Sequence, residues 1–132
     1  MRLVLFVLPF LFVLGCGSAQ QAIEPPLPAD ATIGDLIVAL ERDGYIADAG
    51  PFRLAPLLDV AGHELRFRRG GALHVFEYDT AQEAAADVGD LGVVTAPTSA
   101  TVYRSGRLAV VYFGTDPGLQ LTLSQLLGRA VL

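Results

Sequence analysis

The sequence of 132 residues contains no lysine and a single cysteine, Cys16. One cysteine cannot form a disulfide within the chain, so the folded part depends on a packed apolar core for its stability. All nine basic residues are arginines, and fourteen acidic residues outnumber them. The net charge of −5 argues against non-specific nucleic-acid binding, which requires cations that neutralise phosphates.

The chain also lacks the sequence patterns of common catalytic and nucleotide-binding sites. It contains no G-x-S-x-G motif and no glycine-rich phosphate loop that leads from a strand into a helix. No catalytic residue, metal ligand or cofactor is therefore predicted. Every well-patterned segment is explained by helix capping, turning or packing, which favours a protein that is not an enzyme.

The N-terminal segment has the pattern of a bacterial lipoprotein signal. The apolar run 3–14 suits the core of an export signal and is shorter than the roughly 20 residues of a membrane-spanning helix. Residues 13–16, Val-Leu-Gly-Cys, resemble the lipobox, and the resemblance implies a signal peptide over 1–15 and a lipid on Cys16. Ordinary cleavage after the small residues 17–19, Gly-Ser-Ala, is the alternative.

Residues 16–31 are expected to form a tether between the lipid and the folded part. Their Ser, Ala and Gln residues lead into Pro-Pro-Leu-Pro at 25–28, a composition that favours extended polyproline geometry over a packed core. At about 3.1 Å per residue, such a segment reaches roughly 45 Å. The remainder, 32–132, has the length of a single domain.

Three helices are predicted from apolar spacing and from residues that begin or end helices. The second has small residues that permit close packing against a sheet. The first expected helix is 33–43, capped by Thr32. The second begins at the capping box from Thr80 to Glu83 and is followed, after Gly89 and Gly92, by a loop through Pro97. The third begins at Asp116 and Pro117 and ends at Gly128.

Two β-hairpins are predicted from pairs of alternating segments that are joined by turn residues. The first joins 63–69 to 72–78 through a Gly-Gly pair. The second joins 101–104 to 107–113 through a Ser-Gly pair. The last of these segments is apolar on both faces, which is typical of a central strand.

The order of these elements predicts an α+β domain. We expect a largely antiparallel sheet of about four to five strands, with three helices mainly on one face. Residues 45–49 add a short strand, and 50–59 are expected to be mostly irregular because of their Gly and Pro residues. The residues expected in the core include Leu65, Phe76, Leu123 and Leu126.

A two-residue turn in the first hairpin would fix which residues face each other. It places Leu65 opposite Phe76 on an apolar face. Glu64 and Glu77 then face each other about 5 Å apart on the other face, beside Arg66. Retaining glycosidases use carboxylates at this separation, but the neighbouring arginine is a sufficient structural explanation for the pair.

The two histidines do not predict a metal site. In the same register, His63 and His74 lie about 13 Å apart along the sheet. A single ion cannot reach both imidazoles, because zinc binds its ligands at about 2 Å. Both are interpreted as ordinary strand residues.

Five arginines lie in and around the two hairpin turns of an otherwise acidic chain. One interpretation is contact with an anionic surface such as lipid headgroups, and the other is a pair of solvated turns. The choice depends on whether the two turns lie at the same end of the sheet. The arginines are Arg66, Arg68, Arg69, Arg104 and Arg107.

Several turns, helix caps and core strands resemble those of a known group of proteins. The segments 75–78, 103–108 and 112–117, the alanine-rich helix and the closing Leu-Gly resemble those of a group of small uncharacterised bacterial lipoproteins. The resemblance covers roughly the last half of the chain. It implies the fold and a lipid-anchored place in the cell envelope, and it implies no activity. In a Gram-negative cell the outer membrane is favoured, because no Asp follows Cys16 and this resembles the sorting signal of lipoproteins of that membrane.

The sequence as a whole favours a non-enzymatic binding or interaction module, and a small envelope hydrolase with a loop-built site is the alternative. The expected partners are the membrane, reached through the lipid, and an envelope protein, with no nucleic acid. The expected contact residues are Phe52, in the irregular segment, and Arg66 and Glu77, on an uncovered sheet face.

Lipidation at Cys16 is tested by growing bacteria that express the chain with a labelled fatty acid. We expect the wild type to incorporate the label and the Cys16→Ser variant to incorporate none, because serine offers no thiol for the diacylglycerol. Equal labelling of the two proteins, or an unlabelled wild type, would contradict the assignment.

Overall fold

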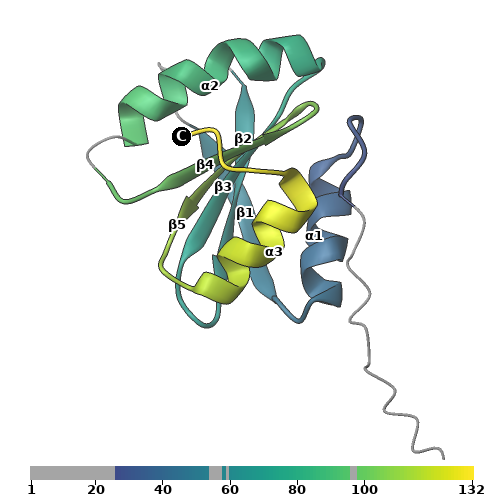
Figure 1. Ribbon diagram of the computed structural model, residues 1–132, viewed down its shortest axis with the longest axis vertical. Helices are drawn as coiled ribbons and strands as arrows, with labels where there is room; N and C mark the ends of the chain where they lie inside the picture. The colour runs from purple at the N-terminus through teal and green to yellow at the C-terminus, as the bar shows by residue number, and fades with distance from the viewer. Residues whose placement is uncertain (1–25, 54–57, 59, 96–97) are drawn as a thin grey trace, which may run out of the picture.

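The computed structural model describes residues 26–53, 58, 60–95 and 98–132 (Figure 1). The described chain forms three helices and a five-stranded, fully antiparallel sheet with the strand order β1-β2-β3-β5-β4. The predicted α+β class is confirmed, and β5 is an inner strand as its sequence indicates. The elements are α1 Ile33–Arg42, β1 Ala47–Arg53, β2 Ala61–Phe67, β3 Ala72–Glu77, α2 Ala81–Thr95, β4 Thr101–Ser105, β5 Leu108–Phe113 and α3 Pro117–Leu127.

The helices are divided between the two faces of the sheet, so the expected arrangement mainly on one face is not observed. Helices α1 and α3 lie side by side on one face, and α2 covers part of the other (Figure 1). Strand β4 runs parallel to β3 with β5 between them, and α2 makes the crossover. The handedness of such a crossover decides which face its helix covers.

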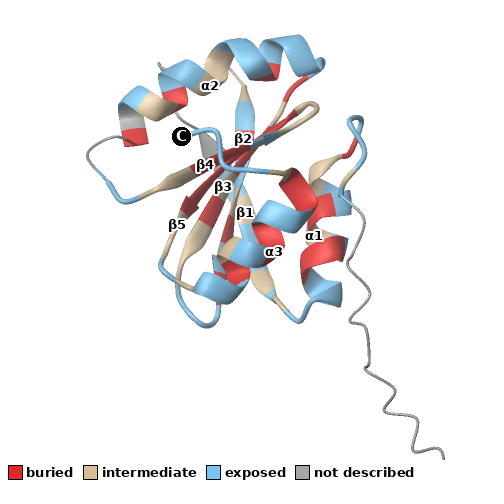
Figure 2. Ribbon diagram, in the orientation of Figure 1, coloured by how far each residue is buried: buried red, intermediate tan, exposed pale blue. Residues whose placement is uncertain are grey.

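Each face has its own apolar core, and the buried residues in Figure 2 follow the inner strands and the inward sides of the helices. The core under α1 and α3 contains Leu65, Leu123 and Leu126, and the core under α2 contains Phe76. All four are at most 1% exposed, which confirms their predicted burial. Leu65 and Phe76, however, lie in different cores.

The helix starts form as predicted, because capping depends on residues close in sequence. The Thr32 hydroxyl accepts from the Asp35 N–H, and the Asp35 carboxylate accepts from the Thr32 N–H. Thr80 and Glu83 make the same reciprocal pair at α2. The Asp116 carboxylate accepts from two backbone N–H groups in the first turn of α3.

Helix α2 continues through Gly89 and Gly92 to Thr95, where the sequence predicts a loop. Tertiary packing overrides the low helix propensity of glycine here. Leu91 is 1% exposed in the core under α2. The side chain of Leu132 lies against Gly92, where a Cβ atom would be only 2.5 Å from the leucine.

Strand β1 is also longer than the expected 45–49 and includes the first part of the segment expected to be irregular. All seven of its residues, Gly50 and Pro51 among them, pair with β2. Proline is tolerated because β1 is an edge strand, where one side of the backbone needs no partner.

The register of the first hairpin differs by three residues from the predicted one. Leu65 lies opposite Leu73, and Gly62 lies opposite Phe76. The turn is longer than Gly-Gly: the Phe67 N–H donates to the Gly71 carbonyl at 3.1 Å.

The longer turn has a conformational cause. Gly70 has a φ of +93°, which suits the left-handed position that closes a three-residue hairpin loop. An odd shift in register moves the residues of one strand to the opposite face relative to their expected partners. Glu64 and Glu77 therefore lie on opposite faces, and the predicted carboxylate pair is wrong.

The second hairpin has Gly106 and Arg107 in its turn, with Ser105 opposite Leu108. Because Ala72 at the start of β3 pairs with Phe113 at the end of β5, the two hairpin turns lie at opposite ends of the sheet. The five arginines near the turns are therefore split into two separate groups.

The end of the expected tether is part of the folded domain. The Leu27 N–H donates to the Leu126 carbonyl at 2.8 Å, and the Arg107 N–H donates to the Ala29 carbonyl at 3.2 Å. Ala31 is 1% exposed. Gly106 has a positive φ and lies so close to the Ala29 backbone that a Cβ would overlap it. The folded part thus begins before residue 32.

The hairpin register is tested with paired cysteines in a chain that carries Cys16→Ser. Glu64→Cys with His74→Cys should form a disulfide on oxidation, because directly opposed residues have Cα atoms about 4.5–5.5 Å apart. Glu64→Cys with Glu77→Cys, the pair that a two-residue turn would bring together, should remain reduced. Non-reducing electrophoresis and mass spectrometry distinguish the two results, and a disulfide in the second pair alone would contradict the register.

Candidate functional site

Helix α2 contacts β4 and β5 at one edge of its sheet face. On the same face, the part formed by β1, β2 and the start of β3 has no described helix over it. Five residues share this face by register. Asp48 of β1 lies opposite Arg66 of β2, and Glu64 of β2 lies opposite His74 of β3. On β5, Val111 lies opposite His74, and Phe113, two residues further along, is on the same face. We call Asp48, Glu64, Arg66, His74 and Phe113 the open sheet patch.

Glu64 is the centre of this patch. Its Oε2 accepts from Arg66 Nε at 2.9 Å, and Arg66 Nη2 lies 2.9 Å from the same oxygen. Its Oε1 lies 3.5 Å from His74 Nε2. The His74 ring in turn lies 4.8 Å from the Phe113 ring, tilted by 55°. One carboxylate therefore orients a cation and an imidazole that stands against an aromatic ring.

The electrostatics of the patch define its charge at neutral pH. The Arg66 guanidinium holds the pKa of the Glu64 carboxyl below its usual value. Burial lowers the pKa of His74, and the neighbouring Glu64 carboxylate opposes this effect only in part. Glu64 is thus ionised and His74 neutral, and the Arg66 side chain, 72% exposed, presents its cation to solvent.

Glu64 and His74 are arranged like the carboxylate and the histidine base of a nucleophilic enzyme, but no nucleophile is found on the described parts of the strands beside them. The residues that flank the pair across the neighbouring strands are Gly50, opposite Glu64, and Val111, opposite His74. Neither carries a hydroxyl or a thiol, which nucleophilic catalysis would need beside the base. Within the described residues there is also no group of three or more His, Cys, Asp or Glu side chains that would hold a metal ion.

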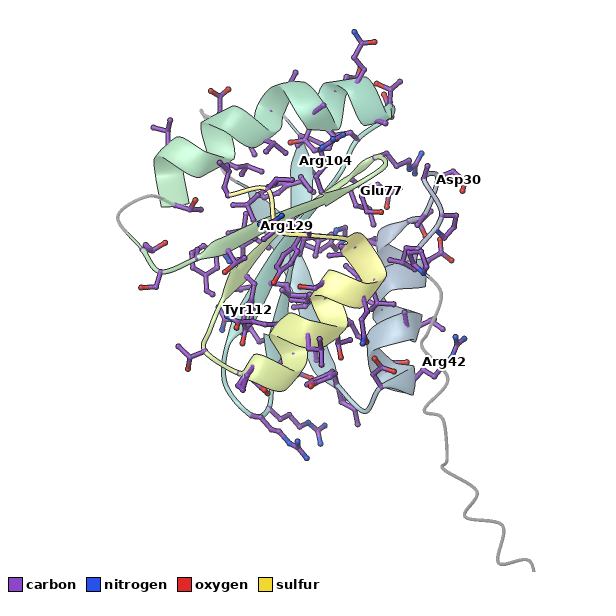
Figure 3. The ribbon with its side chains drawn as sticks, viewed as in Figure 1. Asp30, Arg42, Glu77, Arg104, Tyr112 and Arg129 are labelled. Carbon is purple, nitrogen blue, oxygen red and sulfur yellow. The ribbon has the colours of Figure 1, made fainter. Side chains whose placement is uncertain are left out.

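Glu77 does not belong to the patch, so its prediction as a residue beside Arg66 is wrong. Its carboxylate forms an ion pair with Arg107 and accepts from the Ile33 N–H at 2.9 Å. Figure 3 places it between the β4–β5 turn and the start of α1. Both carboxylate oxygens are engaged inside the fold, which gives Glu77 a structural role.

The other expected site residues have different outcomes. Phe52 lies in β1 opposite Gly62, in a strand and not in the expected loop, and its side chain lies outside the described part. Cys16 lies outside the described residues, so its lipidation stays a prediction. His63 lies opposite Val75, on the face away from His74. The expected separation of the histidines along one face is therefore wrong, and the sheet itself stands between them.

Sequence reasoning missed His74, Phe113 and Asp48 as members of one cluster. The signal that would have found His74 beside Glu64 is Gly70, the first glycine of the pair, which can take the left-handed position that closes a three-residue loop. Asp48 and Phe113 come from strands whose pairing is not local in sequence, and no short-range pattern places them together.

Comparisons with known proteins add no relative, because no family model, curated protein or solved structure matches this chain. Across the part of the chain that the structure describes, none of the helices has the length and apolar character needed to cross a membrane.

Because burial lowers the pKa of His74 below 6.5, the unfolded chain binds a proton at this residue more readily than the folded one. The free energy of unfolding should therefore fall as the pH drops through about 6.5. Urea unfolding at about pH 7.5 and pH 5.5 should show a smaller loss for His74→Gln than for the wild type. His63→Gln, on the opposite face, is the matched control and should keep the wild-type loss; equal losses in all three proteins would contradict the assignment.

Proposed function

We propose that this protein is a non-enzymatic interaction module, anchored by a lipid on Cys16 outside the cytoplasm, and that it binds an envelope protein through the open sheet patch. The observation that carries the proposal is Arg66. Its side chain is 72% exposed, yet two nitrogens of its guanidinium are held by Glu64.

A cation held in place is suited to recognition. Ordering a long side chain on binding costs roughly 0.5–1.5 kcal/mol, and Glu64 holds Arg66 in one orientation before a partner arrives. Arginine and aromatic residues are also enriched at the centres of protein interfaces, and Phe113 supplies an aromatic ring on the same face. The charge and the ring support a partner surface that offers a carboxylate beside an apolar group.

The proposed anchor keeps this surface close to the membrane. Leu27 already belongs to the fold, because its N–H donates to the Leu126 carbonyl, so the proposed tether is at most the segment from Cys16 to Leu27. At about 3.1 Å per residue, these ten or so residues reach roughly 30 Å. The partner is then another protein of the envelope that comes within that distance.

The hydrolase alternative has weaker support. It requires a nucleophile beside the Glu64 and His74 pair, and the strand neighbours Gly50 and Val111 provide none. The polar side chains of the patch are instead explained by one another and by presentation of Arg66.

Site-specific photocrosslinking in cells tests the interaction. A benzophenone amino acid at Asp48, in the full chain with its signal, should give a discrete crosslinked product, because this residue lies beside Arg66. Adding Arg66→Ala should reduce the product at least about tenfold, which corresponds to roughly 1.4 kcal/mol of binding free energy. The control position is Val38, which is 53% exposed on α1 at the other face of the sheet. The same product in equal yield from both positions, or no effect of Arg66→Ala, would contradict the proposal.

A further inference from the structure

A second candidate site lies at the end of the sheet that contains the β2–β3 turn. Here the α1–β1 connection, this turn and the start of α3 enclose a pocket of about 180 Å³. We call it the hairpin pocket. Its floor is formed by Tyr45, Phe67 and Leu119, and its mouth by Ile46, Arg68 and Arg69, with Asp116 at one side.

The floor of the hairpin pocket is apolar and well fixed. Phe67 is 8% exposed and Leu119 is 1% exposed. The Tyr45 ring meets the Phe67 ring edge to face, with centroids 6.3 Å apart. At the mouth, Ile46 is 55% exposed, so an apolar wall continues out to solvent. An apolar group that enters the pocket would lose contact with water on several sides.

The charge at the mouth is positive. Arg68 and Arg69 are exposed, and neither forms an ion pair with a described residue. Asp116 is the one acidic residue in the lining, and its carboxylate caps α3 by accepting from Gly118 at 2.9 Å and Leu119 at 3.3 Å. Two arginines are thus left for a ligand in a protein with an overall net charge of −5. This charge distribution fits an anionic ligand.

The size of the pocket narrows the class of ligand. Pockets for drug-sized molecules measure about 300–1,000 Å³, so this one holds a single side chain. Because the apolar floor adjoins the arginines, the ligand must carry an apolar group and a negative charge only a few bonds apart. The last residue of a peptide has both, since its side chain and its carboxylate are attached to the same Cα atom.

We propose that the hairpin pocket binds the carboxyl-terminal residue of a partner peptide. The apolar side chain packs against Tyr45, Phe67 and Leu119, and the carboxylate pairs with Arg68 and Arg69, which form charge-assisted hydrogen bonds to its oxygens. The site does not depend on the open sheet patch. A phospholipid headgroup would use the same arginines but leave the apolar floor empty, and it serves as the opposing outcome of the test.

The experiment measures binding of a small probe to the full-length chain in detergent by ligand-observed NMR, with detergent alone as the blank. The probe is acetyl-Ala-Ala-Leu with a free carboxylate, and the matched probe is its carboxamide, which keeps the apolar side chain and loses the charge. We expect the acid to bind at least about tenfold more tightly than the amide. Arg68→Gln with Arg69→Gln should abolish this preference, whereas Arg104→Gln, at the other hairpin, should leave it unchanged.

A further variant separates charge from packing. Asp116→Asn keeps a good helix cap and removes the one carboxylate of the lining, so it should strengthen binding of the acid. The proposal is overturned if the acid and the amide bind equally, or if neither binds. It is also overturned if Arg68→Gln with Arg69→Gln reduces co-sedimentation with phosphatidylglycerol vesicles while leaving the acid probe unaffected. None of these outcomes alters crosslinking at Asp48, so the proposed function and this site fail independently.

Discussion

The architecture follows from a sheet with two faces and from the three helices that the described residues place against them. Strands β3 and β5 lie inside the sheet and contribute apolar side chains to both cores. Helices α1 and α3 lie on one face and α2 lies on the other, where Leu58 and Val60 also join the core. Helix α2 packs over β4 and β5 and helps to shield Ala109 and Val111 of β5, and Phe76 of the neighbouring β3, from water. What remains is a polar part of the same face, and its residues must satisfy one another or a partner.

Glu77 joins several parts of the fold that are distant in sequence. One oxygen accepts from the first N–H of α1, and the other pairs with Arg107 in the β4–β5 turn. The backbone of Arg107 in turn binds Ala29 and Tyr78. A partly buried carboxylate is stable here because both a helix N-terminus and a guanidinium face it. The same engagement gives Glu77 a role inside the fold that its position in the strand does not reveal in the sequence.

The predictions succeeded where the structural cause is local. Thr32, Thr80 and Asp116 cap their helices because each needs only residues within three positions. They failed where two local solutions compete: Gly70 and Gly71 permit either a two- or a three-residue loop, and the choice moved Glu64 away from Glu77. The paired edge strand around Pro51 and the crossover face of α2 depend on distant partners, which spacing along the sequence does not reveal.

The two proposed binding surfaces are connected through the end of β2. Arg66 points to the open sheet patch and the next residue, Phe67, points to the other face and forms part of the pocket floor, because side chains alternate along a strand. Arg68 and Arg69 then continue directly into the turn. The position of this one turn therefore sets the geometry of both surfaces, and a change in its length would alter them together. The pairing of β2 with both β1 and β3 holds that turn in place, which makes the hairpin end the rigid reference from which both surfaces are presented.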